Sequence, residues 1–376
     1  MIKNLKLYNF RNLELLEIKL NPKVNVFVGM NGQGKTNIVE SIFMSLTGDS
    51  FRYSENINLI QHGKDACFVK MQLQHESLEF ESNFIIQNSK KERFLNKKKI
   101  SSIDFSKKFP CVVFSPESLS AIKESAEQRR LLIDELVLST SKFGYEILTE
   151  YKKVLRTKNK ILKDYKKEII SKKTATDLLS SINSIFLAAA SRLSYERVKS
   201  IKAIENDFNL NMKNISNSDL TTKIKYTISD IDVTEWNEEL IIALLKKRQN
   251  ELFDAELANG IALVGPHKHD IAFLYSGKDS RFYCSQGQQR ALILSFKMAQ
   301  IMYHRQIYGS YPVLLLDDVL SELDKEKQNS LIEFLNKIDT QIFITTTDFS
   351  LPVQLESKDN TVFQVKEGKV LLEGML

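Results

Sequence analysis

Short stretches of alternating apolar and polar residues dominate the first quarter of the chain and predict β-strands. Residues 2–10 alternate in this way, and residues 24–28 form a short β-branched run that ends before Gly29. After a glycine-rich loop, apolar residues recur at helical spacing between Ile38 and Leu46. Further short strands are expected at residues 67–73, 78–86 and 112–114, with a hairpin at residues 93–101. The pattern predicts strands that bracket one helix.

The pattern changes at about residue 127. From there to about residue 257 the chain has no proline, and Gly144 is its only glycine. Apolar residues recur at steps of three and four, as at Tyr151, Val154 and Leu155. This spacing predicts a helical region that includes paired antiparallel helices. At about 130 residues, with a rise of ~1.5 Å per helical residue, the region is too short for a long coiled-coil arm.

Strand-like patterns return after Gly260. Strands are expected at residues 261–264, 271–275, 313–316 and 341–345, a helix at residues 288–308, and a hairpin from residue 361. The sequence therefore predicts an α/β lobe that is split in two by a mostly helical inserted second lobe. The expected domains are 1–125 for the N-terminal half of the α/β lobe, 126–257 for the helical insertion and 258–376 for the C-terminal half.

Composition adds to this picture mainly by exclusion. Lys and Arg number 53 against 47 for Asp and Glu, and the resulting charge of +6 fits either a polyanionic partner or a compositional bias. Cys67, Cys111 and Cys284 lie far apart and fit neither a disulfide framework nor a zinc site. No stretch approaches the ~20 apolar residues that span a bilayer, and the N-terminus does not resemble a signal peptide. We expect a soluble cytoplasmic protein with no membrane partner.

A phosphate-binding loop follows the expected strand at residues 24–28 and precedes the first helix. It matches the pattern G-x-x-x-x-G-K-[ST] and consists of Gly29, Met30, Asn31, Gly32, Gln33, Gly34, Lys35 and Thr36. Its glycines allow backbone N–H groups to turn toward phosphates at a helix N-terminus. We expect Lys35 to reach the β- and γ-phosphates of ATP and the Thr36 hydroxyl to ligate Mg²⁺. The flanking strand and helix distinguish this loop from a chance glycine-rich turn.

Two carboxylates end the apolar strand at residues 313–316. Asp317 is suited to ligate Mg²⁺, and Asp318 is placed to orient or deprotonate the attacking water. An apolar strand followed by an acid is common, so this pattern gains its meaning from the phosphate-binding loop. Together they predict nucleotide hydrolysis with Lys35, Asp317 and Asp318 as the catalytic residues.

A third motif opens the helix expected at residues 288–308. Ser285, Gln286, Gly287 and Gln288 are similar to the ABC-type signature, which is usually written S-G-G-Q. In ABC-type ATPases this serine–glycine turn caps the γ-phosphate held by the opposite subunit, so the resemblance implies a head-to-tail homodimer around two ATP molecules. Ser321 and Asp324 resemble the D-loop of the same proteins. The simpler interpretation of Ser285 is an ordinary N-cap.

The combined motifs resemble the RecF-like family over nearly the whole chain. They comprise Phe10-Arg11-Asn12, the phosphate-binding loop, Phe114-Ser115-Pro116-Glu117, Gln128-Arg129-Arg130, Gly265-Pro266-His267, SQGQQR at 285–290, LLLDDVLSELD at 314–324 and residues 344–348. This resemblance implies an ABC/SMC-type P-loop ATPase lobe of mixed sheets and flanking helices. It also implies binding of gapped or single-strand/double-strand junction DNA, and work with RecR and RecO to place RecA on single strands.

Two positions depart from the general ABC pattern. Asp318 stands where most members have Glu, and Thr347 stands where many have a switch histidine. RecF-like sequences are similar at both places, so the resemblance predicts a weak ATPase that acts as a switch.

Several weaker signals leave alternatives open. Residues 151–173 contain ten Lys or Arg and two acids, which indicates either a DNA-binding face or a solvated face over a core helix. The hairpin at residues 93–101 and its flank hold a second basic cluster with the same two interpretations. His267 and His269 suggest a metal site less strongly than a structural or nucleotide-sensing loop. Arg11, Arg52 and Arg130 are expected to contact phosphate, a dimer partner or surface carboxylates.

Two other functions share the same motifs. One is the ATP-binding subunit of an ABC transporter, against which the long helical insertion and its basic patch argue. The other is a non-catalytic structural clamp that binds ATP and barely hydrolyses it. The motifs set no hydrolysis rate, so single-turnover hydrolysis is the measurement that separates the clamp from the ATPase.

Overall fold

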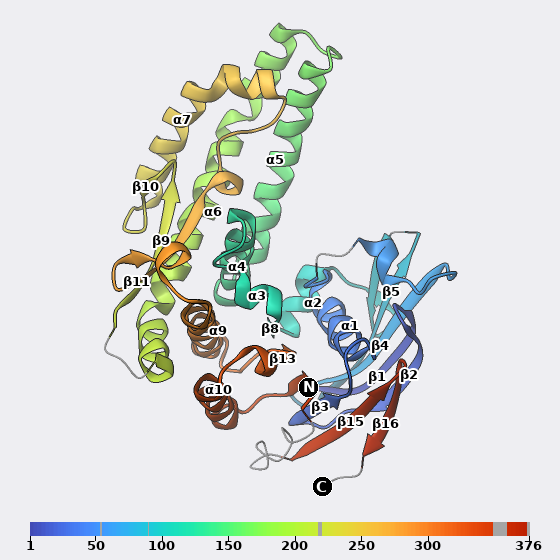
Figure 1. The fold of residues 1–376 in the computed structure, drawn as a ribbon. Coiled ribbons are helices and arrows are strands. Elements are labelled where there is room, and N and C mark those ends of the chain that lie inside the picture. The colour runs from blue at the N-terminus through green and yellow to red at the C-terminus, as the bar shows by residue number, and fades with distance from the viewer. Residues whose placement is uncertain (53–54, 89, 217–219, 349–358, 374–376) are drawn as a thin grey trace. The chain divides into compact units, whose positions relative to one another are not determined.

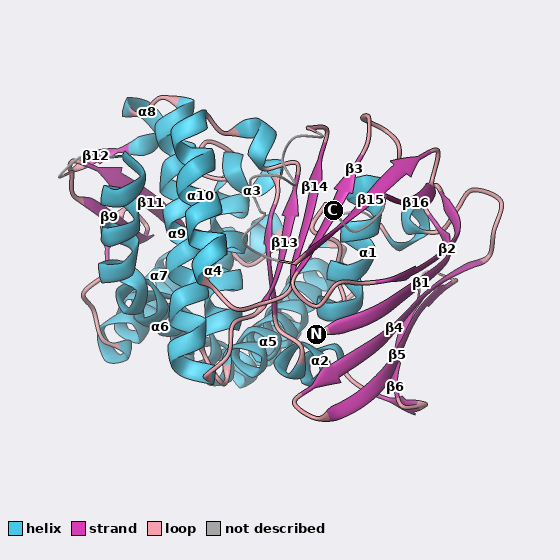
Figure 2. Cartoon of the chain, turned by 90° about the horizontal axis from the view of Figure 1, so that it is seen from below, coloured by secondary structure: helices cyan, strands magenta, loops and turns pink. Residues whose placement is uncertain are grey.

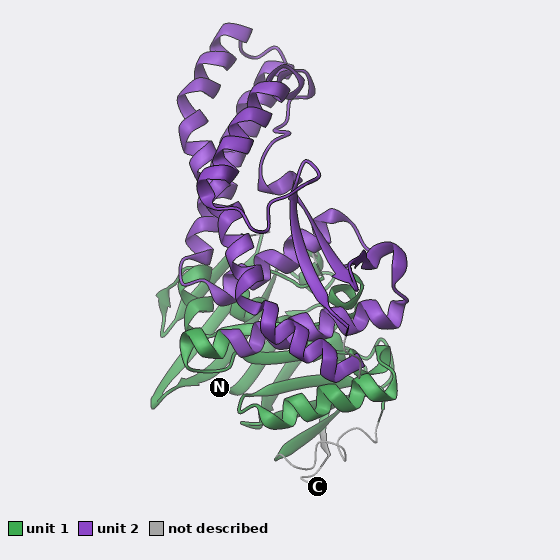
Figure 3. Ribbon diagram, turned by 90° about the vertical axis from the view of Figure 1, so that its left-hand side faces the viewer, with its two compact units in different colours: residues 1–120, 304–376 green, residues 121–303 purple. Residues whose placement is uncertain are grey.

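A computed structural model describes residues 1–52, 55–88, 90–216, 220–348 and 359–373. The chain divides into two compact units, which Figure 3 colours green and purple. Unit 1 contains residues 1–120 and 304–376, and unit 2 contains residues 121–303. Unit 1 has two sheets and unit 2 has one, and each unit has its own buried core, so each is described by itself below.

Unit 1 contains an antiparallel sheet of six strands in the order β2-β1-β4-β5-β6-β7. The strands are β1 (Ile2–Phe10), β2 (Leu13–Lys19), β4 (Ala66–His75), β5 (Leu78–Gln87), β6 (Lys90–Leu95) and β7 (Lys98–Lys99). Inward and outward residues alternate along most of β4 and from Leu16 to Lys19 in β2, as expected for a sheet with one face on the core.

The second sheet of unit 1 has a parallel centre and carries the phosphate-binding loop. Its order is β16-β15-β3-β14-β13-β8. The strands are β3 (Val24–Val28), β8 (Cys111–Phe114), β13 (Val313–Asp317), β14 (Ile342–Thr346), β15 (Asn360–Lys366) and β16 (Lys369–Glu373). Strands β8, β13, β14, β3 and β15 pair in parallel, so their carboxyl ends share one edge. Such an edge is where open α/β sheets bind ligands.

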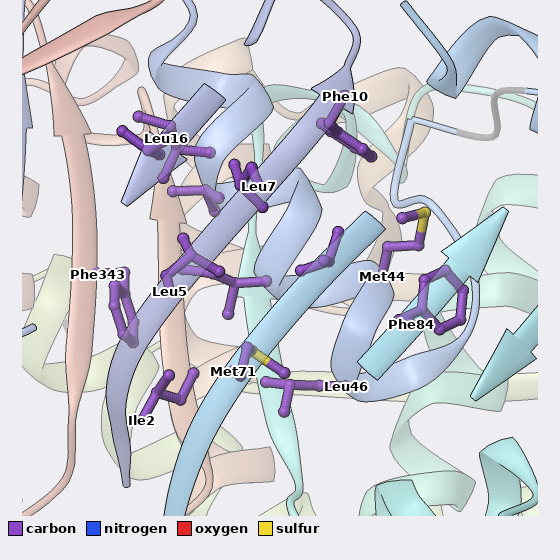
Figure 4. Close-up of a cluster of buried hydrophobic side chains, with 14 of the residues drawn as sticks. Ile2, Leu5, Leu7, Phe10, Leu16, Met44, Leu46, Met71, Phe84 and Phe343 are labelled. Atoms are coloured by element: carbon purple, nitrogen blue, oxygen red, sulfur yellow. The ribbon is translucent and has the colours of Figure 1, made fainter. Parts of the chain in front are cut away.

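Helices and a continuous apolar core join the two sheets of unit 1. The helices are α1 (Lys35–Thr47), η1 (Asn56–Leu59), α2 (Ser102–Lys108), α3 (Pro116–Ser120), η3 (Leu320–Glu322) and α10 (Lys325–Lys337). Figure 4 shows side chains of β1, α1 and β14 meeting in this core, among them Leu5, Met44 and Phe343. Strand β3 is buried on both faces, which explains why four of its five residues are apolar. The exception, the buried Asn25, donates a hydrogen bond to the Asn21 carbonyl oxygen (2.9 Å).

Unit 2 is mostly helical and includes a small sheet. Its helices are α4 (Ala126–Thr140), α5 (Gly144–Lys166), α6 (Lys172–Ser216), α7 (Glu238–Asn259), η2 (Pro266–Lys268), α8 (Ser280–Tyr283) and most of α9 (Gln286–Tyr308). Helices α5, α6 and α7 pack against one another (Figure 1). Four strands form a sheet in the order β10-β9-β11-β12, drawn in magenta in Figure 2: β9 (Thr222–Ile228), β10 (Ile231–Asp232), β11 (Asp270–Tyr275) and β12 (Lys278–Asp279).

The structure departs from the sequence prediction in unit 2. The region expected to be mostly helical, in which no strand was assigned, contains β9 and β10, and the strand expected at residues 261–264 does not form. There, the N–H groups of Leu263 and Val264 donate to the buried Glu256 carboxylate, and that of Ala262 donates to Asn159. Because side chains satisfy these donors, the segment needs no neighbouring strand.

The unit boundary also differs from the expected domain boundary at residue 257. Strand β11 pairs with β9 and not with the sheet that contains β3. Residues 258–303, expected in the C-terminal half of the α/β lobe, therefore belong to unit 2.

Candidate nucleotide-binding site

The phosphate-binding loop begins where β3 reaches the carboxyl edge of the sheet. A Cβ atom at Gly29 would lie 2.3 Å from the carbonyl oxygen of Val365 on β15, so only glycine fits there without moving a backbone. Gly34 has a φ of 110°, a left-handed conformation that favours glycine, and α1 begins at the next residue, Lys35. No side chain caps α1 and no acid lies in its first turn. Its first N–H groups are therefore available to an anion.

Lys35 is folded back over the loop it belongs to. Its ammonium group donates hydrogen bonds to the carbonyl oxygens of Gly29 (2.8 Å) and Met30 (3.1 Å), and its side chain is buried. Met30, Asn31 and Gly32, by contrast, are exposed. The loop thus holds one buried cation beneath an exposed backbone turn.

The turn between β15 and β16 fixes the other side of the loop. The N–H of Gly368 donates to the Gln33 carbonyl oxygen (2.9 Å), and the N–H of Glu367 donates to the Gln33 side-chain oxygen (2.6 Å). The Asn37 amide on α1 donates to the Asn12 side chain (2.7 Å). Segments from both ends of the chain therefore fix the conformation of the loop.

Asp317 ends β13 at the same sheet edge as the loop, with β14 between them. Its Oδ1 accepts a hydrogen bond from the Thr345 hydroxyl (2.8 Å), and its side chain is almost fully buried. Burial raises the pKa of Asp317 to about 6, while hydrogen bonds from Thr345 and Thr36 act in the opposite direction. Thr36 and Asp317, which were assigned separately from sequence, are thus brought together.

Asp318 has a strained conformation beside Asp317. Its φ is 47°, in the left-handed region that costs a non-glycine residue of order 1–3 kcal/mol. Its N–H donates to the same Thr345 hydroxyl (2.9 Å), and its carbonyl oxygen accepts from Ser321 (2.7 Å). The Oδ1 atom is buried and has no hydrogen-bond partner among the described residues. Strain and an unsatisfied carboxylate oxygen together are typical of a functional position.

The donors at this edge fit a Mg²⁺–nucleotide complex. Thr36 and Asp317 offer hard oxygen ligands, and Mg²⁺ is commonly held by one or two protein oxygens together with substrate phosphates. Within the described ranges, no cluster of three or more His, Cys, Asp or Glu side chains is arranged to hold a metal by itself. The residues therefore suit a metal that arrives with a phosphate ligand.

The signature-like segment lies in unit 2 and forms a capping box. The N–H of Gln288 donates to the Ser285 hydroxyl (3.2 Å), and the N–H of Ser285 donates to the Gln288 side chain (2.8 Å). Gln286 and Gly287 form the first turn of α9, and both Ser285 and Gln286 are exposed. The N-cap interpretation of Ser285 is therefore confirmed, and it leaves the hydroxyl at an exposed helix start.

The D-loop-like residues lie in unit 1, directly after Asp318. Ser321 lies in η3, and Asp324 is the N-cap of α10 because it accepts from the Lys327 N–H (3.0 Å). The phosphate-binding loop, both acids and these two residues thus share unit 1, whereas residues 285–288 lie in unit 2.

The histidines considered for a metal site have protein partners. His267 Nδ1 lies 2.5 Å from the Tyr151 hydroxyl and its Nε2 lies 3.0 Å from the Ala262 oxygen, while His269 Nδ1 lies 2.8 Å from the Tyr226 hydroxyl. Burial lowers the pKa of His267 to about 4 and also lowers the pKa of His269. Both rings are parts of a buried hydrogen-bonded network.

All three singled-out arginines make ion pairs or hydrogen bonds within their own unit. Arg11 forms two hydrogen bonds, 2.5 and 2.7 Å long, with the buried Glu40 carboxylate on α1. Arg130 donates to the His269 carbonyl oxygen (2.9 Å). Arg52 lies farther from Glu40, at 4.0 Å, and its side chain is 40% exposed. The Arg52 side chain is thus more exposed than those of Arg11 and Arg130.

Sequence reasoning missed the residues that position the site. Thr345 bonds to both acids, and Gln289 holds the short helix α8 through the Ser280 carbonyl oxygen (2.8 Å). Thr345 was part of a family-like segment without an assigned role. Parallel pairing places Asp317 opposite Thr345, and this register is not visible in the sequence.

The chain has the fold of an SMC-type ATPase head. Residues 1–369 match the family described as RecF/RecN/SMC N terminal domain. The head domain of Smc from Pyrococcus furiosus, solved with an extended coiled coil, is similar with a TM-score of 0.55 and 16% identity over 99% of this chain and 96% of that one. That likeness shows the fold.

Closer relatives define the family. The chain is 34% identical to the DNA replication and repair protein RecF of Geobacter sp. (strain M21), over 98% of each protein. A solved structure of the recombination mediator protein RecF-ATPrS in the RecFOR pathway is 29% identical, with a TM-score of 0.85, over 100% of this chain and 98% of that one. The chain belongs to the RecF family.

Proposed function

We propose that this protein is an ATP-dependent DNA-binding protein of recombinational repair and replication. It acts in the cytoplasm on gapped or single-strand/double-strand junction DNA and, with RecO and RecR, helps to load RecA. The names of its relatives, a DNA replication and repair protein and a recombination mediator in the RecFOR pathway, support this assignment.

One observation carries the proposal. The phosphate-binding loop and the buried acid Asp317 lie at the same sheet edge, and Thr36 of the loop forms a hydrogen bond with Asp317. The loop amides and the start of α1 bind the phosphates of ATP, and Lys35 turns from the loop carbonyls toward them. Thr36 and Asp317 would hold Mg²⁺, which would neutralise phosphate charge there.

Asp318 is the residue that acts on the attacking water. Its unsatisfied Oδ1 accepts a hydrogen bond from that water and orients it, while the Thr345 hydroxyl keeps the backbone of Asp318 in place. A carboxylate one methylene shorter than Glu reaches less far. We propose slow hydrolysis that resets a switch, with Lys35, Asp317 and Asp318 as the catalytic residues.

The switch is dimerisation. Ser285, Gln286, Gly287 and Gln288 of one copy cap the γ-phosphate held by the other copy, and Ser321 and Asp324 lie beside this contact. The exposed start of α9 supports the assignment, because its N–H groups and the Ser285 hydroxyl can donate to an anion. A swing from 1:99 to 99:1 in favour of the dimer needs about 5.5 kcal/mol of differential ATP binding.

Light scattering with and without ATP tests this proposal. ATP is expected to double the mass of the wild-type protein, and a gapped duplex is expected to add to it. Lys35→Ala removes ATP binding and therefore pairing. Ser285→Arg binds ATP yet stays monomeric, whereas Ser181→Arg, at an exposed serine of α6, pairs normally. Normal pairing of Ser285→Arg would show that the signature does not complete the partner's site.

The alternatives are separated by further measurements. Among the described residues, no helix is long and apolar enough to cross a membrane, and RecF family membership does not support a transporter subunit. The non-catalytic clamp predicts barely any product in a single-turnover experiment with DNA present, whereas the ATPase predicts product that Asp318→Asn abolishes.

A further inference from the structure

Helix α5 presents basic side chains along one face. Lys152, Arg156, Lys160 and Lys163 lie in the helix and Lys167 is its C-cap; all five are exposed. At 3.6 residues per turn they fall within a sector of about 80° and extend over about 22 Å. These five residues are called the basic stripe.

The opposite face of α5 is already buried. Ile147, Tyr151 and Ile161 are buried, and Lys158 forms a buried ion pair with Glu256 of α7 at 2.7 Å. Helix α5 packs on α6 and α7 through this face (Figure 1). The helix is therefore anchored, and its apolar side chains are not free to enter a lipid surface.

Acidic residues of α5 lie outside the stripe. On the same helical wheel, Glu146, Glu150 and Asp164 fall at about 120–160° from Lys152, beyond the ~80° sector of the stripe. Glu150 lies 3.7 Å from Arg192 of α6. Lys152, Lys160 and Lys163 form no ion pair or side-chain hydrogen bond with any residue in the described ranges. An ordinary solvated face interleaves both signs, whereas this one separates them.

We propose that the basic stripe binds the phosphate backbone of duplex DNA, an inference that rests on the proposed DNA-binding function. A straight row of cations on a rigid helix matches a regular row of phosphates. Tyr151 is buried and Tyr165 is half-buried, and these are the only aromatic residues between positions 151 and 167. The stripe therefore lacks exposed rings for base stacking and contacts the backbone without reading sequence.

The salt dependence of DNA binding measures this contact. Lys152→Ala/Lys160→Ala/Lys163→Ala removes three cations and keeps good helix formers on the surface. Anisotropy of a labelled gapped duplex is measured with ATP across a salt series. Each lost phosphate contact lowers the slope of log K against log salt by about 0.9, so the triple variant is expected to lose about 2.7.

A matched control removes the same charge elsewhere in unit 2. Lys199 of α6 and Lys246 and Lys247 of α7 are exposed lysines outside α5. The variant Lys199→Ala/Lys246→Ala/Lys247→Ala is expected to keep the wild-type slope. Both triple variants are expected to keep the ATP-dependent mass and the DNA-free hydrolysis rate, which shows that they are folded.

Each outcome has one meaning. If the stripe variant keeps the wild-type slope of log K against log salt, or if the control variant loses as much slope as the stripe variant, the basic stripe is not the DNA contact. The proposed DNA-binding function stands in either case. A wild-type protein that binds no DNA refutes the proposed function itself and leaves the stripe without its partner. Binding to anionic phospholipid vesicles that the stripe variant loses, with DNA binding unchanged, replaces DNA by a membrane surface and also overturns the proposal.

Discussion

Replacing Asp317 by Asn is expected to stabilise the Mg²⁺-free protein while removing its function. Asp317 is 4% exposed, and burial raises the pKa of its carboxyl group from 3.8 to about 6. Because the folded-state pKa lies above the unfolded value, the folded protein binds more protons between roughly pH 4 and pH 6. The free energy of unfolding therefore falls as the pH rises through this window. Above about pH 6 the protein bears the full destabilisation that the buried, ionised carboxylate causes.

The size of this effect follows from the shift in pKa. A difference of about two units corresponds to about 3 kcal/mol at pH 8, and to much less at pH 5. Asn has nearly the same shape, and its amide oxygen can still accept the Thr345 hydrogen bond. It carries no charge to desolvate. The variant is therefore expected to be more stable than the wild type by up to about 3 kcal/mol at pH 8, with the two converging toward pH 4.

Hydrogen exchange in the amides of β13 and β14 measures this difference locally. The single tryptophan, Trp236, lies in unit 2 and reports on the other unit. Asp339→Asn is a suitable control, since Asp339 is a surface carboxylate paired with Lys23, and such pairs contribute roughly 0–1 kcal/mol. Equal protection of wild type and Asp317→Asn at pH 8 would refute the assignment of a buried charge. Mg²⁺–ATP is expected to protect the wild type more than the variant.

Two further predictions concern the loop and the signature. Gly29→Ala places a Cβ against the Val365 carbonyl oxygen. The variant is expected to destabilise unit 1 by about 1–3 kcal/mol, measured by thermal unfolding, and to weaken ATP binding, measured by nucleotide titration. An unchanged melting temperature would contradict the close approach of Gly29 to Val365. Ser285→Ala is expected to cost about 0.5–2 kcal/mol in unit 2, and adding Gln288→Ala is expected to cost less than the sum of the single variants, because the two caps are reciprocal. Additive losses, measured through Trp236 fluorescence, would mean that the caps act separately.

The local motifs could be predicted from the sequence because their chemistry is contiguous. A phosphate-binding loop needs its glycines, lysine and hydroxyl within a few residues, so the resemblance and the spacing both identified residues 29–36. Thr345, by contrast, lies far along the chain from Asp317 and reaches it through parallel strand pairing. Single-sequence periodicity carries no information on which strands pair, so this positioning residue could not be found in advance.

Two errors in unit 2 have separate physical causes. The alternation at residues 222–228 is strand-like, with Ile224, Tyr226 and Ile228 facing inward. The absence of proline and glycine over the whole region favoured a helix and hid this alternation. At residues 261–264 the error is the reverse: the apolar run predicted a strand, and none forms. Its hydrogen-bond donors are satisfied by Glu256 and Asn159, so hydrophobicity alone did not make it a strand.

Three residues that lower the folding stability of unit 1 lie together at one sheet edge. Asp317 carries a buried charge, Asp318 combines left-handed backbone with an unsatisfied oxygen, and Lys35 is a buried cation held by carbonyl oxygens. Sequences selected for stability alone avoid such groups, so their clustering indicates selection for binding. A ligand that carries both phosphates and a divalent cation would offset all three at once. Its binding must therefore stabilise unit 1, so nucleotide affinity and the stability of this unit are thermodynamically linked.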